Sequence, residues 1–479
     1  MPRPNILFLM TDQMQAQVLD GAHPCHTPNL DRLARRGLRF TRAYTPNAVC
    51  SPARASLMTG LLPHNHGVLT VTHTVDNDQS CLRTRHPHWA QTLDGAGYRT
   101  GYFGKWHVER SNRLADFGWQ TDGSSQSDLY REARRAIPGD AGKPSYQMAH
   151  YCENPGYKRA LLYGVTDARL EQRNMGLTTA LASDFLTDAL DGEAPWCCFV
   201  SHTEPHDPFV TSADAYNMYD VDQLAMPPNW FDETAGRPNL YRKAARTWAS
   251  MSQRQKREAA ACYYGSITEL DQLFSQLIDK VEAAGQLDNT IVVVTSDHGE
   301  LLGAHGLYCK NIGAFEEVYN IPLLIAGPGL SADATTPARV GLHDLHPTLL
   351  ELTGYPTTTR PDSRSFVDVL KTPVEHASRF TTGFAEYRGG RIDLTQRIVW
   401  DGPWKFVFNG FDFDELYNLD EDPGEMHNRA EDPGCQEQLQ KMTALMWRTV
   451  RDTGDHSLLN SQYLALRVAP YGPDIADQY

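Results

Sequence analysis

Residues 5 to 13 read Asn-Ile-Leu-Phe-Leu-Met-Thr-Asp-Gln, and this stretch decides the fold class. The apolar run from Ile6 to Met10 is continuous rather than alternating, which predicts a strand that is covered on both faces, as in a parallel sheet. Asp12 and Gln13 follow directly, and ligands of open α/β sheets sit at the carboxyl ends of strands. The stretch therefore predicts an α/β fold with polar groups at the end of its first strand.

Three more continuous apolar runs resemble the first. They are Cys197–Ser201, Thr290–Ser296 and Pro322–Ala326, and we interpret all of them as buried parallel strands. His206 comes after the first of these runs and Asp297 after the second. Because parallel strands end at one edge of a sheet, we expect Asp12, His206 and Asp297 to converge on a single crevice.

Two segments have the pattern of helices. Residues 267 to 281 carry apolar side chains at steps of three and four, and Gly285 then provides a stop before the strand at 290. The segment Pro28–Gly37 is also predicted to be a helix, with Leu30 and Leu33 on one face. Helix, glycine and strand in this order are typical of an α/β unit.

The chain of 479 residues is too long for one ordinary core. We expect a catalytic domain over residues 1–370, with an insertion of unclear periodicity at about 110–190 that borders the site. Short strands such as Gln396–Trp400 and Lys405–Asn409 predict a small α+β subdomain over residues 371–479. The stretch after about residue 455, with Pro470, Gly472 and Pro473, is interpreted as an extended terminal arm.

Charge and composition argue against several classes of partner. The formal net charge of -15 opposes binding to nucleic acid or to anionic membranes, both of which need a positive field. No segment approaches the roughly 20 apolar residues of a membrane span, and the run at Ile6–Met10 is too short for the core of a signal peptide. Nine scattered cysteines without a CxxC pair fit free thiols in a reducing compartment. We therefore expect a cytoplasmic protein.

The sharpest local motif is Cys50-Ser51-Pro52-Ala53-Arg54, which is followed by Thr59-Gly60. It resembles the signature of type I sulfatases, members of the alkaline-phosphatase-like superfamily. Further segments match that family in the same order along the chain: Asn5–Gln13, Thr27–Asp31, Gly104–His107, Ser296–Glu300, Gly303–Gly306, Tyr417–Leu419 and Asp422–Glu425. The resemblance implies a large mixed, mainly parallel sheet that is sandwiched by helices, with a smaller C-terminal α+β subdomain.

The resemblance also implies an unusual nucleophile. In this family the cysteine, here Cys50, is oxidised by a separate formylglycine-generating enzyme. The aldehyde is hydrated, and one oxygen of the hydrate attacks sulfur. The product of that attack collapses by expelling the anion and restoring the aldehyde. For Cys50 alone, the rival interpretation is a buried structural thiol.

A metal site is expected around Asp12, Gln13, Asp297 and His298, with the oxygen of position 50 as a further ligand implied by the family. Oxygen donors suit calcium or magnesium, and the imidazole widens the choice toward manganese or zinc. Calcium is our first expectation, with manganese or magnesium as alternatives. The pairs Asp12-Gln13 and Asp297-His298 look more like those of choline-sulfatase and phosphonate monoester hydrolase relatives, which leaves phosphoryl substrates open.

Five further residues stand at the family's motif positions. By resemblance, Arg54 supports the formylglycine, while Lys105 and Lys310 hold the sulfate oxygens. His206 is expected to protonate the leaving oxygen, and His107 to help deprotonate the hemiacetal. The rival interpretation of each histidine is an ordinary core or surface residue, and we favour the functional one. The two interpretations are evenly balanced for residues beside the motifs: His66, His73, His202, Glu204 and His305.

Three functions are compatible with these observations. The first hypothesis is hydrolysis of a small sulfate ester, with a carbohydrate, aryl, alkyl or choline-like group. The alternative is hydrolysis of phosphonate monoesters or phosphodiesters at the same site. A third hypothesis is a catalytically silent homologue, in which Cys50 is unmodified and no metal is bound. Assembly into a homo-oligomer is left open.

Overall fold

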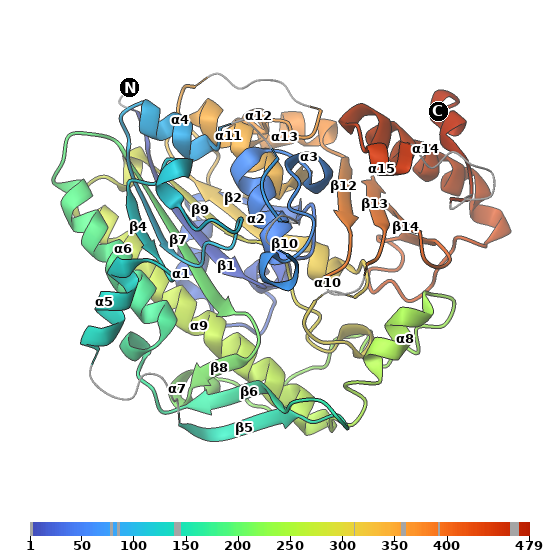
Figure 1. Ribbon diagram of the computed structural model, residues 1–479, viewed down its shortest axis with the longest axis horizontal. Coiled ribbons are helices and arrows are strands. Elements are labelled where there is room, and N and C mark those ends of the chain that lie inside the picture. The colour runs from blue at the N-terminus through green and yellow to red at the C-terminus, as the bar shows by residue number, and fades with distance from the viewer. Residues whose placement is uncertain are drawn as a thin grey trace.

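The structure is a computed structural model that describes residues 3–76, 80–83, 87–137, 145–310, 312–355, 361–390, 393–459 and 469–479. Its centre is an eight-stranded sheet in the order β11-β2-β10-β9-β1-β7-β3-β4 (Figure 1). The strands are β1 (Asn5–Asp12), β2 (Gly37–Tyr44), β3 (Arg99–Gly104), β4 (Thr121–Ser124), β7 (Trp196–Pro205), β9 (Thr290–Ser296), β10 (Asn320–Ala326) and β11 (Ala334–Gly341). The predicted α/β class is confirmed.

Strand direction differs from the sequence prediction at one place. The strands β9, β1, β7, β3 and β4 run parallel to one another, as expected. The fourth apolar run lies in β10, which is antiparallel to both β9 and β2, so its assignment as a parallel strand was wrong. A continuous apolar run reports burial on both faces, and that burial is the same for either direction.

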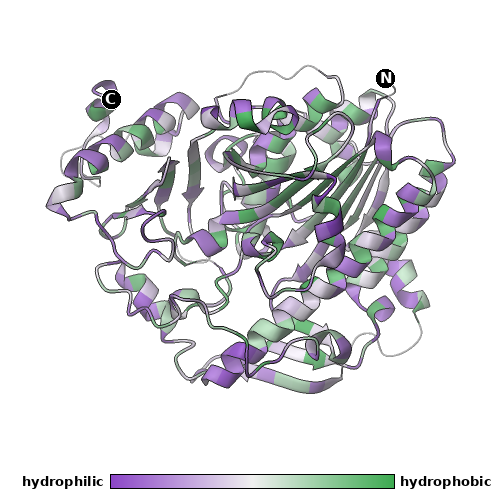
Figure 2. Cartoon of the chain, turned by 180° about the vertical axis from the view of Figure 1, so that it is seen from behind, coloured by the Kyte–Doolittle hydropathy of each residue, from purple (hydrophilic) through white to green (hydrophobic). Residues whose placement is uncertain are grey.

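Helices cover both faces of the sheet. Ile6, Phe8 and Met10 of β1 face a core with α2 (Cys50–Thr59), α4 (Trp89–Gly95) and α11 (Leu345–Leu352). Leu7 and Leu9 face the opposite core, with α1 (Pro28–Ala34), α6 (Asn174–Leu190) and α9 (Gln253–Ala283). In Figure 2 the strands of this sheet are mainly green, whereas the helices alternate between green and purple. Burial on both faces is why β1 lacks polar alternation.

The two predicted helices are present. The buried stripe of residues 267–281 lies in α9, which Ser252 caps at its N-terminus by accepting a bond from the Gln255 amide at 3.2 Å. Gly285 takes a left-handed φ of 70° just after α9. The other helix, α1, ends at Ala34 rather than at Gly37, where β2 already begins.

The segment of about 110–190 is less of an insertion than predicted. It contributes β4 to the central sheet, and its helix α6 packs on β3 and β7. Only part of it stands apart: β5 (Tyr146–Cys152) and β6 (Ala160–Thr166) form a three-stranded sheet with β8 (Phe209–Ser212), at the lower edge of Figure 1. The helix α6 escaped the sequence analysis because its buried residues are not confined to one face.

The C-terminal region forms a second, antiparallel sheet. Its order is β12 (Thr382–Tyr387), β13 (Gln396–Asp401), β14 (Trp404–Asn409) and β15 (Glu415–Asn418), and α14 (Gln436–Thr453) packs on it. The expected terminal arm was wrong for the described residues 469–479. Ile475 and Ala476 are buried in the core around α14, and the Trp447 indole donates to the Tyr471 carbonyl at 2.9 Å. The domain boundary near residue 370 stays a prediction.

The remaining short helices are α3 (Pro63–His66), α5 (Asp128–Ala136), α7 (Ala213–Tyr216), α8 (Asn239–Ala245), α10 (Glu316–Tyr319), α12 (Val367–Lys371), α13 (Pro373–His376) and α15 (His456–Leu459). Within the described part of the chain, no helix combines the length and the apolar character that a bilayer crossing requires.

Candidate active site

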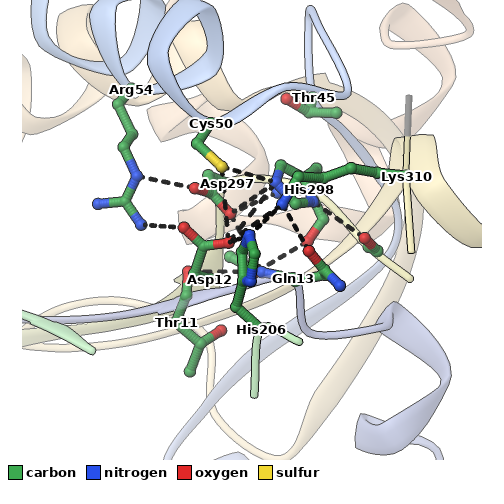
Figure 3. Close-up of polar contacts among 12 residues, drawn as sticks. Thr11, Asp12, Gln13, Thr45, Cys50, Arg54, His206, Asp297, His298 and Lys310 are labelled. Carbon is green, nitrogen blue, oxygen red and sulfur yellow. Dashed lines mark hydrogen bonds and ion pairs between the residues drawn. The ribbon is translucent and has the colours of Figure 1, made fainter. Parts of the chain in front are cut away.

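Residues from distant parts of the chain meet at the carboxyl ends of β1 and β9 (Figure 3). Asp12 is the last residue of β1, Asp297 and His298 follow β9, and Cys50 begins α2. The Cys50 thiol lies 3.3 Å from Nε2 of His298 and 3.7 Å from Oδ1 of Asp12. All four side chains are buried, and their potential ligand atoms lie within 4.8 Å of one another. The structure thus places position 50 beside both carboxylates.

Arg54 lies between the two buried carboxylates. Its Nε donates to Oδ2 of Asp297 at 2.7 Å, and a terminal nitrogen donates to Oδ2 of Asp12 at 3.2 Å. Cys50 and Arg54 are four residues apart on α2, so the helix presents both side chains on the same face. Arg54 is 1% exposed. This buried cation compensates part of the negative charge that the two carboxylates bring into the protein.

Two lysines add positive charge to the same place. The Lys105 ammonium forms an ion pair with Oδ2 of Asp12, and the Lys310 ammonium lies 3.9 Å from Oδ1 of that carboxylate. Burial alone would raise the pKa of Asp12, but Lys105, His206 and Lys310 together hold it below its usual range. Burial likewise opposes ionisation of Cys50, yet Lys105, Lys310 and His298 keep its pKa well below the ordinary value. The pocket therefore favours an anion at position 50.

Gln13 contributes its side-chain amide rather than a charge. Its Oε1 accepts a bond from the Lys310 ammonium at 2.6 Å, and its Nε2 donates to Oδ1 of Asp207 at 3.0 Å. The same Nε2 contacts the carboxylate of Glu300. Burial raises the pKa of Glu300 to about 7. Neither Glu300 nor Asp207 was among the site residues predicted from the sequence, although Glu300 lies in the matched segment Ser296–Glu300.

His206 points its ring into the site from the loop after β7. Its Nδ1 lies 2.6 Å from the backbone carbonyl of Asp207, to which it donates, and its Nε2 contacts the Lys310 ammonium. Burial and Lys310 both lower the pKa of His206, but Asp12 and other neighbours outweigh them, and the net shift is upward. A proton can thus be held at this position near neutral pH.

His107 also contacts the Cys50 side chain. It has a left-handed φ of 51°, and its Nε2 is 3.2 Å from Nδ1 of His73. Burial lowers the pKa of His107, which favours the neutral ring that a proton acceptor needs.

A cavity of about 1050 Å³ opens above this cluster. Five of the predicted catalytic residues line it: Cys50, Lys105, His107, His206 and Lys310. Other lining residues are Val71, Thr72, His73, Thr74, Trp106, Glu109, Arg110, Asn112, Ser125, Gln126, Thr203, Asp207, Cys309, Ile312, Tyr387, Gly390 and Leu394. Of these other lining residues the sequence analysis named only His73, and it expected that the segment of about 110–190 would border the site.

The structure distinguishes between the residues for which a functional and a structural interpretation were both open. His66 is buried against the Ser56 hydroxyl at 2.9 Å, and His305 is buried against Asp232 at 2.6 Å, so both have structural contacts. His202 is buried beside Thr179 and the Phe274 ring. His73 lines the main cavity, and Glu204 lines a smaller neighbouring cavity of about 480 Å³.

Comparison with known proteins gives concordant matches. The family model described as Sulfatase matches residues 4–355, and the one described as N-sulphoglucosamine sulphohydrolase, C-terminal, matches residues 303–452. The choline-sulfatase of Rhizobium meliloti is 30% identical over 463 residues, covering 90% of this chain and 83% of the relative. The N-acetylglucosamine-6-O-sulfatase of Bacteroides thetaiotaomicron is 25% identical over 483 residues, covering 89% of this chain and 82% of the relative.

Among solved structures, a phosphonate monoester hydrolase from Silicibacter pomeroyi is similar with a TM-score of 0.77 at 25% identity. The match covers 95% of this chain and 96% of that protein. It confirms the predicted alkaline-phosphatase-like fold: a mixed, mainly parallel sheet between helices, with a C-terminal antiparallel subdomain.

Proposed function

This chain belongs to the sulfatase family, and we propose that it hydrolyses sulfate esters, R–O–SO₃⁻ to R–OH and sulfate, at the cavity above Cys50. The observation that carries the proposal is that Cys50, Lys105 and Lys310 line this cavity and converge with two buried carboxylates, Asp12 and Asp297, and with the buried Arg54 that pairs with both. A tetrahedral anion requires fixed positive charge where negative charge grows in the transition state. Arg54, Lys105 and Lys310 supply it.

The donor set fits one divalent ion. Asp12 and Asp297 offer carboxylate oxygens beside position 50. Nδ1 of His298 lies 2.9 Å from the Gly299 carbonyl, to which it donates, and this leaves Nε2 as the ligating nitrogen. The amide oxygen of Gln13 completes the proposed set. We expect calcium, with manganese or magnesium as alternatives, and such an ion would polarise a sulfuryl oxygen and lower the pKa of the oxygen at position 50.

The proposed nucleophile is formylglycine, made from Cys50 by a formylglycine-generating enzyme. Lys105 and Lys310 would bind the sulfuryl oxygens, and Arg54 would hold the two carboxylates in place. His206 would deliver its proton to the leaving oxygen, because an alkoxide leaves poorly without one. His107 would accept a proton from the oxygen at position 50.

We propose a sulfated carbohydrate as the substrate class. The cavity of about 1050 Å³ is large for a choline-sized group, and Asn112, Ser125 and Gln126 give its outer wall hydrogen-bonding capacity for hydroxyls. One relative acts on N-acetylglucosamine 6-O-sulfate by its name, which supports this choice. Aryl and alkyl sulfates remain members of the test panel.

The test couples two measurements on one preparation. Mass spectrometry of the peptide with residue 50 should show a loss of about 18 Da, from thiol to aldehyde. Turnover of a panel of sulfate esters should stop when a chelator removes divalent ions and return when calcium or manganese is added. Full turnover by protein with an unmodified Cys50, or no turnover of any sulfate ester by modified protein, would reject the proposal.

Phosphonate monoesters are the second candidate substrates. The Asp12-Gln13 and Asp297-His298 pairs and the likeness to a phosphonate monoester hydrolase favour this option. Comparing kcat/KM for phenyl sulfate and for a phenyl phosphonate monoester separates the two proposals.

A cytoplasmic location stays a prediction, which fractionation of cells expressing the tagged chain would check.

A further inference from the structure

The Gln13 side chain has two ends of similar shape but opposite chemistry. Its oxygen can accept hydrogen bonds or bind a cation, whereas its nitrogen can only donate. Gln13 is 0% exposed, so solvent does not decide which end points into the site. The orientation depends on the neighbours that contact each end.

Two carboxylates contact the nitrogen end. The Nε2 donates to Oδ1 of Asp207 at 3.0 Å and also contacts Oε2 of Glu300. The opposite end, Oε1, accepts from the Lys310 ammonium at 2.6 Å. Acceptors at one end and a cation at the other select the same orientation of the amide.

Glu300 is itself held by the backbone. Its Oε1 accepts from the backbone amide of Leu302 at 2.8 Å and from that of Cys309 at 2.6 Å. These bonds leave Oε2 to face Gln13. Because Cys309 directly precedes Lys310, the same carboxylate also anchors the backbone that carries this lysine. Glu300 is buried and does not line the cavity, so it acts through its neighbours and not on substrate.

We propose that Glu300 is a positioning residue that turns the Gln13 amide so that its oxygen faces Lys310 and the proposed divalent ion. The inference rests on the proposed function, since it assigns Gln13 to the ion. Residues that orient metal ligands typically contribute about 10- to 100-fold to metal affinity.

The test is a double-mutant cycle read by Mn²⁺ affinity of the metal-stripped protein, measured by calorimetry and by electron paramagnetic resonance. In Glu300→Gln, the new amide oxygen can still accept from Leu302 and Cys309, so its NH₂ group faces the NH₂ group of Gln13. The Gln13 nitrogen then keeps Asp207 as its acceptor but meets a donor at residue 300, which weakens the preference for the orientation that turns the oxygen toward the ion. We expect Mn²⁺ binding about 10- to 100-fold weaker, with the melting temperature close to that of the wild type.

In the double variant Gln13→Glu with Glu300→Gln, the new amide of residue 300 donates to the new carboxylate of residue 13, which also lies beside Asp207. We expect it to recover part of the lost affinity, whereas Gln13→Glu alone places the carboxylates of residues 13, 207 and 300 together and does not. The matched control is Glu258→Gln, a carboxylate on α9 that accepts from the Tyr163 hydroxyl at 2.7 Å, away from the cavity. It should bind Mn²⁺ like the wild type.

Three outcomes overturn the proposal, and they distinguish a failure of this inference from a failure of the proposed metal centre. Wild-type affinity in Glu300→Gln, or equal affinity of Gln13→Glu with and without the second substitution, removes Glu300 from the site while the proposed metal centre stands. Absence of Mn²⁺ binding by the wild type rejects the proposed metal centre together with this inference.

Discussion

Among the described residues, two of the three clusters of potential metal ligands invite comparison, because the first has a member, Cys50, in the lining of the cavity of about 1050 Å³ and the second does not. The first is Asp12, Cys50, Asp297 and His298. The second is His64, Glu386 and Asp455, which joins α3 to the C-terminal sheet. In each cluster the potential ligand atoms lie within 4.8 Å of one another. Proximity and residue type alone would suggest a metal ion at both.

Their neighbours make the difference. In the second cluster Arg397, 0% exposed, donates to Oδ2 of Asp455 at 2.8 Å and lies 3.6 Å from Oε2 of Glu386. Arg388 pairs with the same two carboxylates. The two arginines thus pair with the carboxylate oxygens of Glu386 and Asp455 that a metal ion would need as ligands. The first cluster also contains an arginine, but it borders a cavity of about 1050 Å³ that can admit an anion. A cluster becomes a candidate site through access to a ligand, and otherwise it stabilises the fold.

We call the first cluster, which borders the cavity, the open cluster, and the second, whose carboxylates pair with arginines, the closed cluster. The largest expected effect comes from a substitution in the open cluster. Cys50→Ala should lower sulfate-ester turnover by about 10⁴-fold or more, because it removes the nucleophile. The melting temperature should change little. Steady-state kinetics and thermal unfolding measure the two quantities. Cys81→Ala, at an exposed cysteine outside the cavity, is the matched control and should keep wild-type turnover. Residual turnover above a few per cent in Cys50→Ala would contradict the assignment.

The next largest effect is expected from a substitution in the closed cluster. Arg397→Leu leaves Glu386 and Asp455 buried with less compensation and should lower the free energy of unfolding by about 3–5 kcal/mol. Turnover per folded molecule should be unchanged, since Arg397 does not line the cavity. Urea unfolding measures the loss. Arg36→Leu removes the exposed pair with Asp288 and should cost at most about 1 kcal/mol. Equal losses in the two variants would show that the buried cluster is not a cooperative unit.

A smaller effect is expected from a substitution beside the open cluster, which tests whether His206 is the general acid. His206→Ala should slow hydrolysis of a sulfate ester with an alkyl leaving group by about 100-fold, because no acid protonates the alkoxide. For 4-nitrophenyl sulfate, whose leaving group needs no proton, the loss should be clearly smaller. Comparing kcat for the two substrates measures this. An equal loss on both would make His206 a binding residue rather than the acid.

The smallest effect is a pH dependence of the closed cluster. Burial lowers the pKa of His64, but the hydrogen bond and charge of Glu386 outweigh it, so the folded pKa is raised. A raised histidine pKa stabilises the fold fully below the unfolded value of about 6.5, and the contribution is lost as the pH rises through the folded pKa. We expect the wild type to lose about 1 kcal/mol or less above neutral pH. His64→Gln should lack this decline, as urea unfolding across the range would show.

Much of this architecture could be predicted from the sequence, because its signals are local. The continuous apolar runs identified four strands of the central sheet, and the polar residues that follow them identified Asp12, His206 and Asp297. Other features have no local signal. Neither the antiparallel direction of β10 nor the packing of Ile475 against α14 follows from the residues nearby. Both depend on partners far away in the sequence.

By itself, the sequence determined the α/β class, the resemblance to sulfatases and the residue types at the strand ends, because these are properties of short segments. Only the tertiary structure decided that Arg54 lies between Asp12 and Asp297 and that Glu300 contacts the nitrogen of Gln13. It also decided that arginines close the second cluster. The physical reason is that hydrogen bonds and ion pairs depend on distances of a few ångströms between residues hundreds of positions apart.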